Sequence, residues 1–132
     1  MILDSSAVVS ILSAEDDGPK FARTLESGGP VRMSAASYLE TAIVIDRSSV
    51  PAGSGRLDQF IRLFEVEIRP VTLAQAKIAR QAYRDFGKGS GHPAQLDFGD
   101  CFTYALAIDA DEPLLFKGTD FGKTDVRVVP VS

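Results

Sequence analysis

The stretch that most constrains this chain is its N-terminal run, Met1-Ile2-Leu3-Asp4-Ser5-Ser6. Three consecutive apolar residues without polar alternation favour a short strand that is buried on both faces. The run stops at a carboxylate, so Asp4 is expected at the carboxyl end of that strand. In open α/β sheets this end lines the crevice where ligands bind. The run therefore predicts an α/β fold with an acidic group at the functional edge of its sheet.

Strand-like and helix-like segments alternate along the rest of the chain, which is typical of a parallel sheet with helices on both faces. Further strands are predicted at 31–33, 66–69, 113–116 and 126–129, and loops at 48–55 and 87–93. Ser34, Thr72 and Asp97 are predicted to cap helices. The last of these helices should bury Phe98 and Cys101. We predict a three-layer α/β/α sandwich, with a mainly parallel sheet of about five strands, formed by residues 1–132 as one domain.

Composition excludes several classes of protein. The net charge of −4 argues against a generic electrostatic binder of nucleic acid, although a nuclease can combine an acidic metal site with a separate basic strip. A single cysteine, Cys101, cannot form an internal disulfide or a cysteine-rich zinc site. The sequence shows neither a secretion signal nor about 20 consecutive apolar residues for a membrane span. These features predict a cytoplasmic protein.

Four acidic residues fall near one edge of the predicted sheet: Asp4, Glu40, Asp100 and Asp120. Each also has a structural explanation. Glu40 follows Ser37 at capping-box spacing, and Asp120 is a residue type common in turns. Asp100 would lie near the N-terminus of a helix capped by Asp97, where its negative charge interacts favourably with the helix dipole.

A shared site explains these residues better than four independent structural roles. Two unit charges about 4 Å apart repel by about 4 kcal/mol at an effective dielectric of about 20, so folding alone would not gather them. Carboxylates suit a hard divalent cation, and we predict that Asp4, Glu40, Asp100 and Asp120 bind Mg²⁺ or Mn²⁺. Such a site can activate water and clamp a phosphodiester. Ser6 is predicted to orient Asp4 through its hydroxyl.

The order and spacing of four short motifs resemble the PIN-domain ribonucleases of the VapC toxin group, from type II toxin–antitoxin systems. The motifs are Met1-Ile2-Leu3-Asp4-Ser5-Ser6-Ala7, Ser37-Tyr38-Leu39-Glu40-Thr41, Phe98-Gly99-Asp100-Cys101-Phe102 and Leu114-Leu115-Phe116-Lys117-Gly118-Thr119-Asp120-Phe121. This resemblance implies a small α/β/α sandwich that cleaves RNA with Mg²⁺ or Mn²⁺ and leaves 5′-phosphate and 3′-hydroxyl ends. It also implies a homodimer or a hetero-oligomer with a cognate antitoxin whose tail occupies the active-site groove. The fourth acidic position varies in the family, so Asp97 or Asp125 can substitute for Asp120.

Other chemistries have weaker support. A serine or cysteine hydrolase would need a histidine base, and the only histidine, His92, lies between Gly91 and Pro93 in a predicted loop. A phospho-acceptor receiver module remains an alternative, but its third strand should end on an aspartate and here reads Ile68-Arg69-Pro70. A PIN-like domain that binds RNA or protein without cleaving it is a further alternative.

Two surfaces are predicted to contact partners. Lys77, Arg80, Arg84 and Lys88 recur at spacings that place them on one face of a helix leading into the glycine-rich loop, and we predict that this basic strip contacts RNA phosphates. The outer sides of the helices at 21–25 and 57–64 are predicted to form an apolar groove for an antitoxin helix.

Overall fold

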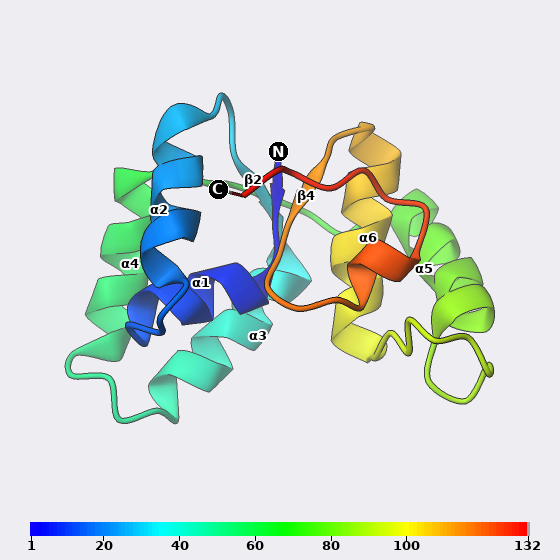
Figure 1. The fold of residues 1–132 in the computed structure, drawn as a ribbon, viewed down its shortest axis with the longest axis horizontal. Helices are drawn as coiled ribbons and strands as arrows, with labels where there is room; N and C mark the ends of the chain where they lie inside the picture. The colour runs from blue at the N-terminus through cyan, green and yellow to red at the C-terminus, as the bar shows by residue number, and fades with distance from the viewer. Residues whose placement is uncertain (132) are drawn as a thin grey trace.

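The computed structural model describes residues 1–131, and its helices and strands alternate as the sequence predicts (Figure 1). The strands are β1 (Ile2–Leu3), β2 (Arg32–Ser34), β3 (Glu67–Arg69) and β4 (Leu114–Leu115). The helices are α1 (Ser5–Leu12), α2 (Gly18–Ser27), α3 (Ala35–Asp46), α4 (Gly53–Leu63), α5 (Leu73–Phe86) and α6 (Phe98–Ala110), followed by the 3₁₀ helix η1 (Phe121–Lys123). Within residues 1–131, no helix is both long enough and apolar enough to cross a membrane.

The four strands form a parallel sheet in the order β3-β2-β1-β4. The prediction of about five strands was therefore wrong by one. The segment 126–129 contacts β4 only through an isolated bridge between Leu114 and Val128. Pro130 follows this bridge and has no N–H group with which to extend the pairing.

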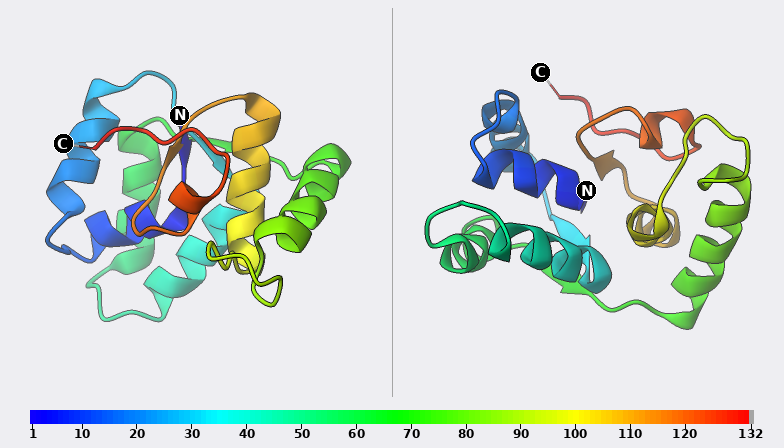
Figure 2. Two further views of the ribbon diagram at one scale, coloured as in Figure 1. Left: turned by 45° about the vertical axis from the view of Figure 1, so that its right-hand side comes forward. Right: turned by 90° about the horizontal axis from the view of Figure 1, so that it is seen from below.

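Both faces of the sheet are covered, as the apolar N-terminal run predicts. Ile2 and Leu3 are fully buried, but they point to opposite faces and join two different hydrophobic clusters. Leu3 packs among residues of α1, α2 and α4, whereas Ile2 packs among residues of α5 and α6. Figures 1 and 2 show these two helix groups on either side of the central strands. The prediction of a three-layer sandwich is confirmed.

The helix starts follow local side-chain chemistry. Ser34 caps α3 by accepting a hydrogen bond from the Ala36 N–H, and Thr72 caps α5 by accepting one from the Gln75 N–H. The predicted loop at 48–55 is shorter than expected because α4 already begins at Gly53. A Cβ atom at Gly53 would lie only 2.8 Å from Ile45 Cγ2, so the missing side chain lets α4 approach α3.

An ion-pair network fixes the N-terminus beside the sheet. The Met1 ammonium donates to Pro30 O at 2.8 Å and to Glu112 Oε1 at 2.9 Å. Arg32 Nη1 donates to both carboxylate oxygens of Glu112, at 2.8 and 2.7 Å. Partial burial acts to raise the pKa of Glu112, but hydrogen bonds and attraction from Met1 and Arg32 hold it below its usual range. Glu112 thus joins the start of β1 to the start of β2.

Replacing Glu112 with Gln should lower the free energy of unfolding at pH 7 by about 1–3 kcal/mol, because two charge-assisted contacts lose their anion. Glu112 has a depressed folded-state pKa, so its stabilisation is present above the unfolded pKa and is lost as the pH falls through the folded value. The difference from wild type should therefore shrink in acid. Denaturant unfolding of both proteins across this pH range measures it.

Asp111→Asn is the matched control, because Asp111 is 94% exposed and pairs only with the exposed Arg127. We expect this control to change stability by less than about 0.5 kcal/mol. Equal losses in the two variants would contradict the anchoring role of Glu112.

Candidate functional site

Asp4 is a buried carboxylate at the carboxyl end of β1, where it also caps α1. Its Oδ2 accepts a hydrogen bond from the Ser6 N–H at 3.0 Å, and its Oδ1 accepts one from the Thr103 hydroxyl at 2.8 Å. The Thr103 proton is committed to Asp4, so the Ser37 hydroxyl 2.8 Å away donates to Thr103. Residues of α1, α3 and α6 therefore fix the orientation of this carboxylate.

Ser6 contacts Asp4 in a different way from the predicted one. Its backbone N–H makes the contact, while its hydroxyl accepts a hydrogen bond from the Lys117 N–H at 2.9 Å. In this structure the Ser6 hydroxyl contacts the segment after β4, and its role in orienting Asp4 stays a prediction.

Glu40 reaches the same edge from α3. Its Oε1 accepts a hydrogen bond from the Ser5 hydroxyl at 2.8 Å. Its Oε2 lies so close to Gly99 that a Cβ atom at that position would collide with it. Gly99 therefore allows the Glu40 carboxylate to lie against the first turn of α6.

Asp97 and Asp100 form a capping box at the start of α6. Asp97 Oδ1 accepts from the Asp100 N–H at 2.8 Å, and Asp100 Oδ2 accepts from the Asp97 N–H at 3.0 Å. The predicted cap at Asp97 is confirmed, and the structural explanation of Asp100 also holds. This role occupies one oxygen of Asp100 and leaves Oδ1 available to a ligand.

The electrostatics connect Asp4, Glu40, Asp97 and Asp100, which we call the acidic cluster. Burial, followed by repulsion from Asp97 and Asp4, raises the pKa of Asp100 to about 7, although a hydrogen bond from the Asp97 backbone opposes the rise. Burial also raises the pKa of Glu40, with the Ser5 hydrogen bond opposing it and repulsion from Asp4 and Asp97 adding to it. Both shifts mean that the assembled site disfavours its own negative charge.

The structure brings Asp97, rather than Asp120, into the acidic cluster. Asp120 is exposed at the start of η1, and the repulsion that raises the pKa of Glu40 and Asp100 comes from Asp4 and Asp97. Asp125 accepts a hydrogen bond from the Tyr104 hydroxyl at 2.6 Å. The role of Asp120 as a metal ligand stays a prediction.

The donor set fits a hard divalent cation, although the acidic cluster is not a closed cage. Among residues 1–131, no three carboxylate, histidine or cysteine side chains converge into a ready-made metal site. Mg²⁺ is usually bound through one or two carboxylates together with waters and substrate oxygens, so it does not require such a cage. Burial is the main cause of the raised pKa values of Asp100 and Glu40, and repulsion from Asp4 and Asp97 adds to it; a bound cation would offset both effects.

Comparison with known proteins identifies the family. The family model described as PIN domain matches residues 1–127. The chain is 54% identical over 127 residues to ribonuclease VapC28 of Mycobacterium tuberculosis, an alignment that covers 96% of each chain. This chain belongs to the VapC group of PIN-domain proteins. The identification confirms the resemblance noted in the sequence and leaves the receiver alternative without support.

Solved structures give the same fold for this VapC chain. VapC20 of Mycobacterium tuberculosis, described as a sarcin–ricin loop cleaving toxin, aligns with a TM-score of 0.76 at 18% identity, covering 97% of each chain. A toxin–antitoxin complex from Klebsiella pneumoniae aligns with a TM-score of 0.73 at 16% identity, covering 98% of this chain and 96% of that one. At these identities the likeness concerns the fold alone.

Three residues near the VapC acidic cluster escaped the sequence analysis. Thr103 orients Asp4, Ser5 orients Glu40, and Gly99 makes room for Glu40. Thr103 carries little signal in the sequence, because one threonine within an otherwise apolar helix looks like core. Gly99 at the second position of a helix offered a clearer signal, since glycine there suggests a close approach.

The basic strip lies as predicted on the exposed side of α5 and the loop after it, and all four side chains are exposed. The prediction for Phe98 was wrong. Its side chain is 76% exposed instead of belonging to the buried face of α6. Cys101, in contrast, is buried as predicted.

Replacing Asp100 with Asn should stabilise the metal-free protein at pH 8 by about 1 kcal/mol after solvent screening. The change removes a charge that Asp97 and Asp4 repel, and the amide oxygen can still accept from the Asp97 N–H. The folded-state pKa is raised, so the stability due to Asp100 is complete below the unfolded value of 3.8 and is lost as the pH rises through about 7. The advantage of Asn should therefore shrink as the pH falls.

Thermal unfolding in EDTA and in Mg²⁺, at several pH values, tests this prediction. Mg²⁺ should stabilise wild type by RT ln(1 + [Mg²⁺]/Kd) and the Asp100→Asn variant much less. Asp16→Asn, an exposed carboxylate in the turn before α2, is the control and should behave as wild type. An Asp100→Asn protein that is less stable than wild type in EDTA, yet equally stabilised by Mg²⁺, would remove Asp100 from the metal site.

Proposed function

We propose that this VapC chain is a Mg²⁺- or Mn²⁺-dependent endoribonuclease and the toxin of a type II toxin–antitoxin system. The observation that carries the proposal is the acidic cluster, which collects four carboxylates at the carboxyl end of the sheet and raises the pKa of two of them. Such mutual repulsion destabilises the protein unless a cation binds. The names of two similar proteins, ribonuclease VapC28 and a toxin that cleaves the sarcin–ricin loop, support RNA as the substrate class.

The residues of the acidic cluster have distinct roles in this proposal. Asp4, Asp100 and Glu40 would hold the metal, and Asp97 takes the fourth acidic place while it orients Asp100. Mg²⁺ or Mn²⁺ bound there would supply Lewis-acid activation of water and neutralise charge on the phosphodiester. Thr103 and Ser5 keep the two carboxylates directed at the site.

RNA should be cleaved internally in Mg²⁺ or Mn²⁺, and cleavage should stop in EDTA. The products should carry 5′-phosphate and 3′-hydroxyl ends. Glu40→Gln keeps the size of the side chain and its contact with Ser5 but loses the negative charge that would help to hold the metal, so it should abolish most activity, whereas Asp16→Asn should retain it. Gel analysis of labelled RNA with end-group mapping checks these outcomes. Full activity in EDTA would exclude the metal mechanism.

The basic strip supports RNA as the ligand, because three of its cations lie on α5 and the fourth in the loop after it, and α5 packs against α6, the helix that carries Asp100. Removing one charge at Lys77, Arg80, Arg84 or Lys88 should reduce the slope of log K against log salt for RNA binding by up to about 1. Arg23→Ala removes an exposed cation from α2 and should leave the slope unchanged. Binding titrations at several salt concentrations measure the slope. Unchanged slopes in all four strip variants would show that the strip is only a solvated helix face.

A cognate antitoxin is the second partner in this proposal. Two hollows border α4 and share Leu63 and Phe64: one of about 300 Å³ also touches Leu25 near the end of α2, and one of about 480 Å³ lies against α1. The apolar groove between the helices at 21–25 and 57–64 stays a prediction. Leu63 is 75% exposed, so an apolar helix of a partner could bury it. The similar complex from Klebsiella pneumoniae is described as containing both toxin and antitoxin, which supports this partner. Exposed Leu39 and Ile43 on α3 support association of two copies.

A further inference from the structure

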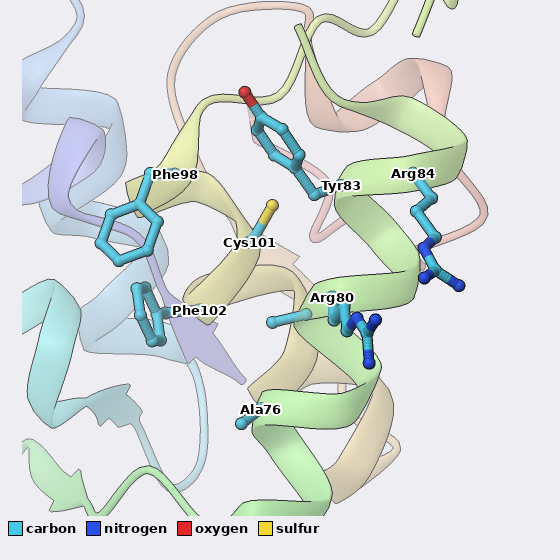
Figure 3. A pocket seen from close by; sticks show the side chains of 8 residues that line it. Ala76, Arg80, Tyr83, Arg84, Phe98, Cys101 and Phe102 are labelled. Carbon is cyan, nitrogen blue, oxygen red and sulfur yellow. The ribbon is translucent and has the colours of Figure 1, made fainter.

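An apolar pocket lies in the groove between α5 and α6, on the side of the molecule that carries the basic strip. Its volume is about 490 Å³, within the range of about 300–1,000 Å³ that is usual for small-ligand sites. Arg80, Tyr83 and Arg84 line it from α5, and Phe98, Cys101 and Phe102 line it from α6. Figure 3 shows the Cys101 side chain between Tyr83 on one side and the two phenylalanines on the other. We call this hollow the α5–α6 pocket.

The walls of the α5–α6 pocket suit a flat, aromatic ligand. Phe98 is 76% exposed and Tyr83 44% exposed, so both rings offer surface that nothing in residues 1–131 covers. Phe98 and Phe102 pack edge to face with ring centroids 5.0 Å apart, which holds the Phe98 ring in place. The Cys101 side chain is buried and lies between the two aromatic walls, so the floor of the pocket is also weakly polar. A planar base can stack against such walls without losing hydrogen bonds to buried polar groups.

The charge around the α5–α6 pocket selects the kind of ligand. Arg80 and Arg84 contribute to the wall on the α5 side, but Figure 3 shows their guanidinium groups directed away from Phe98 and Phe102, so the two charges lie on exposed surface next to the apolar hollow and not inside it. An apolar side chain from a protein would fill the hollow without using these two neighbouring cations, whereas a nucleotide presents a base for the hollow and a phosphate for the cations. Stacking on aromatic rings beside arginines is how proteins commonly bind single-stranded RNA.

The α5–α6 pocket also adjoins the acidic cluster. Phe98 is the first residue of α6 and lies between the capping residues Asp97 and Asp100. Its neighbour Gly99 faces the Glu40 carboxylate. A base stacked on Phe98 would therefore belong to a nucleotide next to the phosphodiester at the carboxylates.

We propose that the α5–α6 pocket binds one unstacked base of the RNA strand beside the scissile phosphodiester, with Phe98 and Tyr83 stacking on the base and Arg80 and Arg84 binding the adjacent phosphate. This inference rests on the proposed ribonuclease function and names its base-binding subsite. The subsite tolerates different bases, because its walls are apolar and stacking does not depend on the hydrogen-bonding edge of the base.

The test combines two pocket variants with an RNA that lacks one base. Phe98→Ala removes the stacking ring, and Ala76→Phe fills the α5–α6 pocket from an exposed position of α5. The RNA contains a site that wild type cleaves, and single abasic nucleotides are placed in turn on either side of it. Affinity is measured by fluorescence anisotropy in EDTA, where no cleavage is expected, and cleavage rates are measured in Mg²⁺.

Two control variants match the chemistry but lie outside the α5–α6 pocket. Leu73→Ala removes an apolar side chain that is 72% exposed at the start of α5. Ala74→Phe adds the same ring as Ala76→Phe on the same helix, but two residues earlier and thus on another face. Circular dichroism and thermal unfolding of all four variants establish that they fold.

We expect Phe98→Ala and Ala76→Phe to bind the intact RNA roughly 5-fold to 100-fold more weakly than wild type, with the control variants unchanged. One abasic position should weaken wild type to a similar extent, and it should have little further effect on Phe98→Ala, because variant and RNA then lack the same contact. Cleavage rates at low RNA concentration should fall in parallel.

If wild type cleaves RNA and both pocket variants bind and cleave it equally well, the subsite is excluded, but the proposed ribonuclease function still holds. The subsite is also excluded if Phe98→Ala weakens RNA binding but its loss of affinity simply adds to the loss caused by each abasic position. If the two variants instead lose binding to a co-purified protein and keep RNA binding, the pocket is a protein contact and the proposal is wrong. Wild type without any RNA cleavage in Mg²⁺ or Mn²⁺ would overturn the proposed function and this inference with it.

Discussion

The burial of the Asp4 carboxylate is the constraint on which the rest of the site depends. A charged group that is 97% withdrawn from solvent is costly unless hydrogen bonds replace its water, and here Ser6 and Thr103 replace it. These partners come from different parts of the chain, so satisfying one side chain fixes the start of α1 and the inner face of α6. Ser37 then extends the same chain of hydrogen bonds into α3.

Asp97 and Asp100 show that a structural role and a functional one can share the same atoms. Their reciprocal hydrogen bonds cap α6 and would exist in a helix with no other purpose. The fold then places this cap beside Asp4 and Glu40, where the pKa of Asp100 rises to about 7. The cap keeps two carboxylates together despite their repulsion, which would favour the binding of the proposed cation.

Features that depend on neighbouring residues could be predicted from the sequence, whereas contacts between distant segments could not. The buried strand at Ile2–Leu3 and the caps at Ser34 and Asp97 depend on adjacent residues, and the structure confirms them. The sheet lost its expected fifth strand because pairing depends on a partner strand and not on the β propensity of 126–129. Phe98 follows the apolar periodicity of α6, but the helix end projects beyond the core, so periodicity alone gave the wrong burial.

The acidic total of the chain and a role in RNA binding are compatible because charge is segregated over short distances. Exposed charges are screened beyond a Debye length of about 8 Å at physiological salt, so an RNA strand responds to the surface nearest to it and not to the sum of −4. Along α5 that surface carries Lys77, Arg80 and Arg84. The carboxylates of the acidic cluster are partly buried, and a divalent cation would offset their charge where the phosphodiester has to approach. In the proposed function the two regions would therefore act in sequence on the same strand, the basic strip by attraction and the acidic cluster by chemistry.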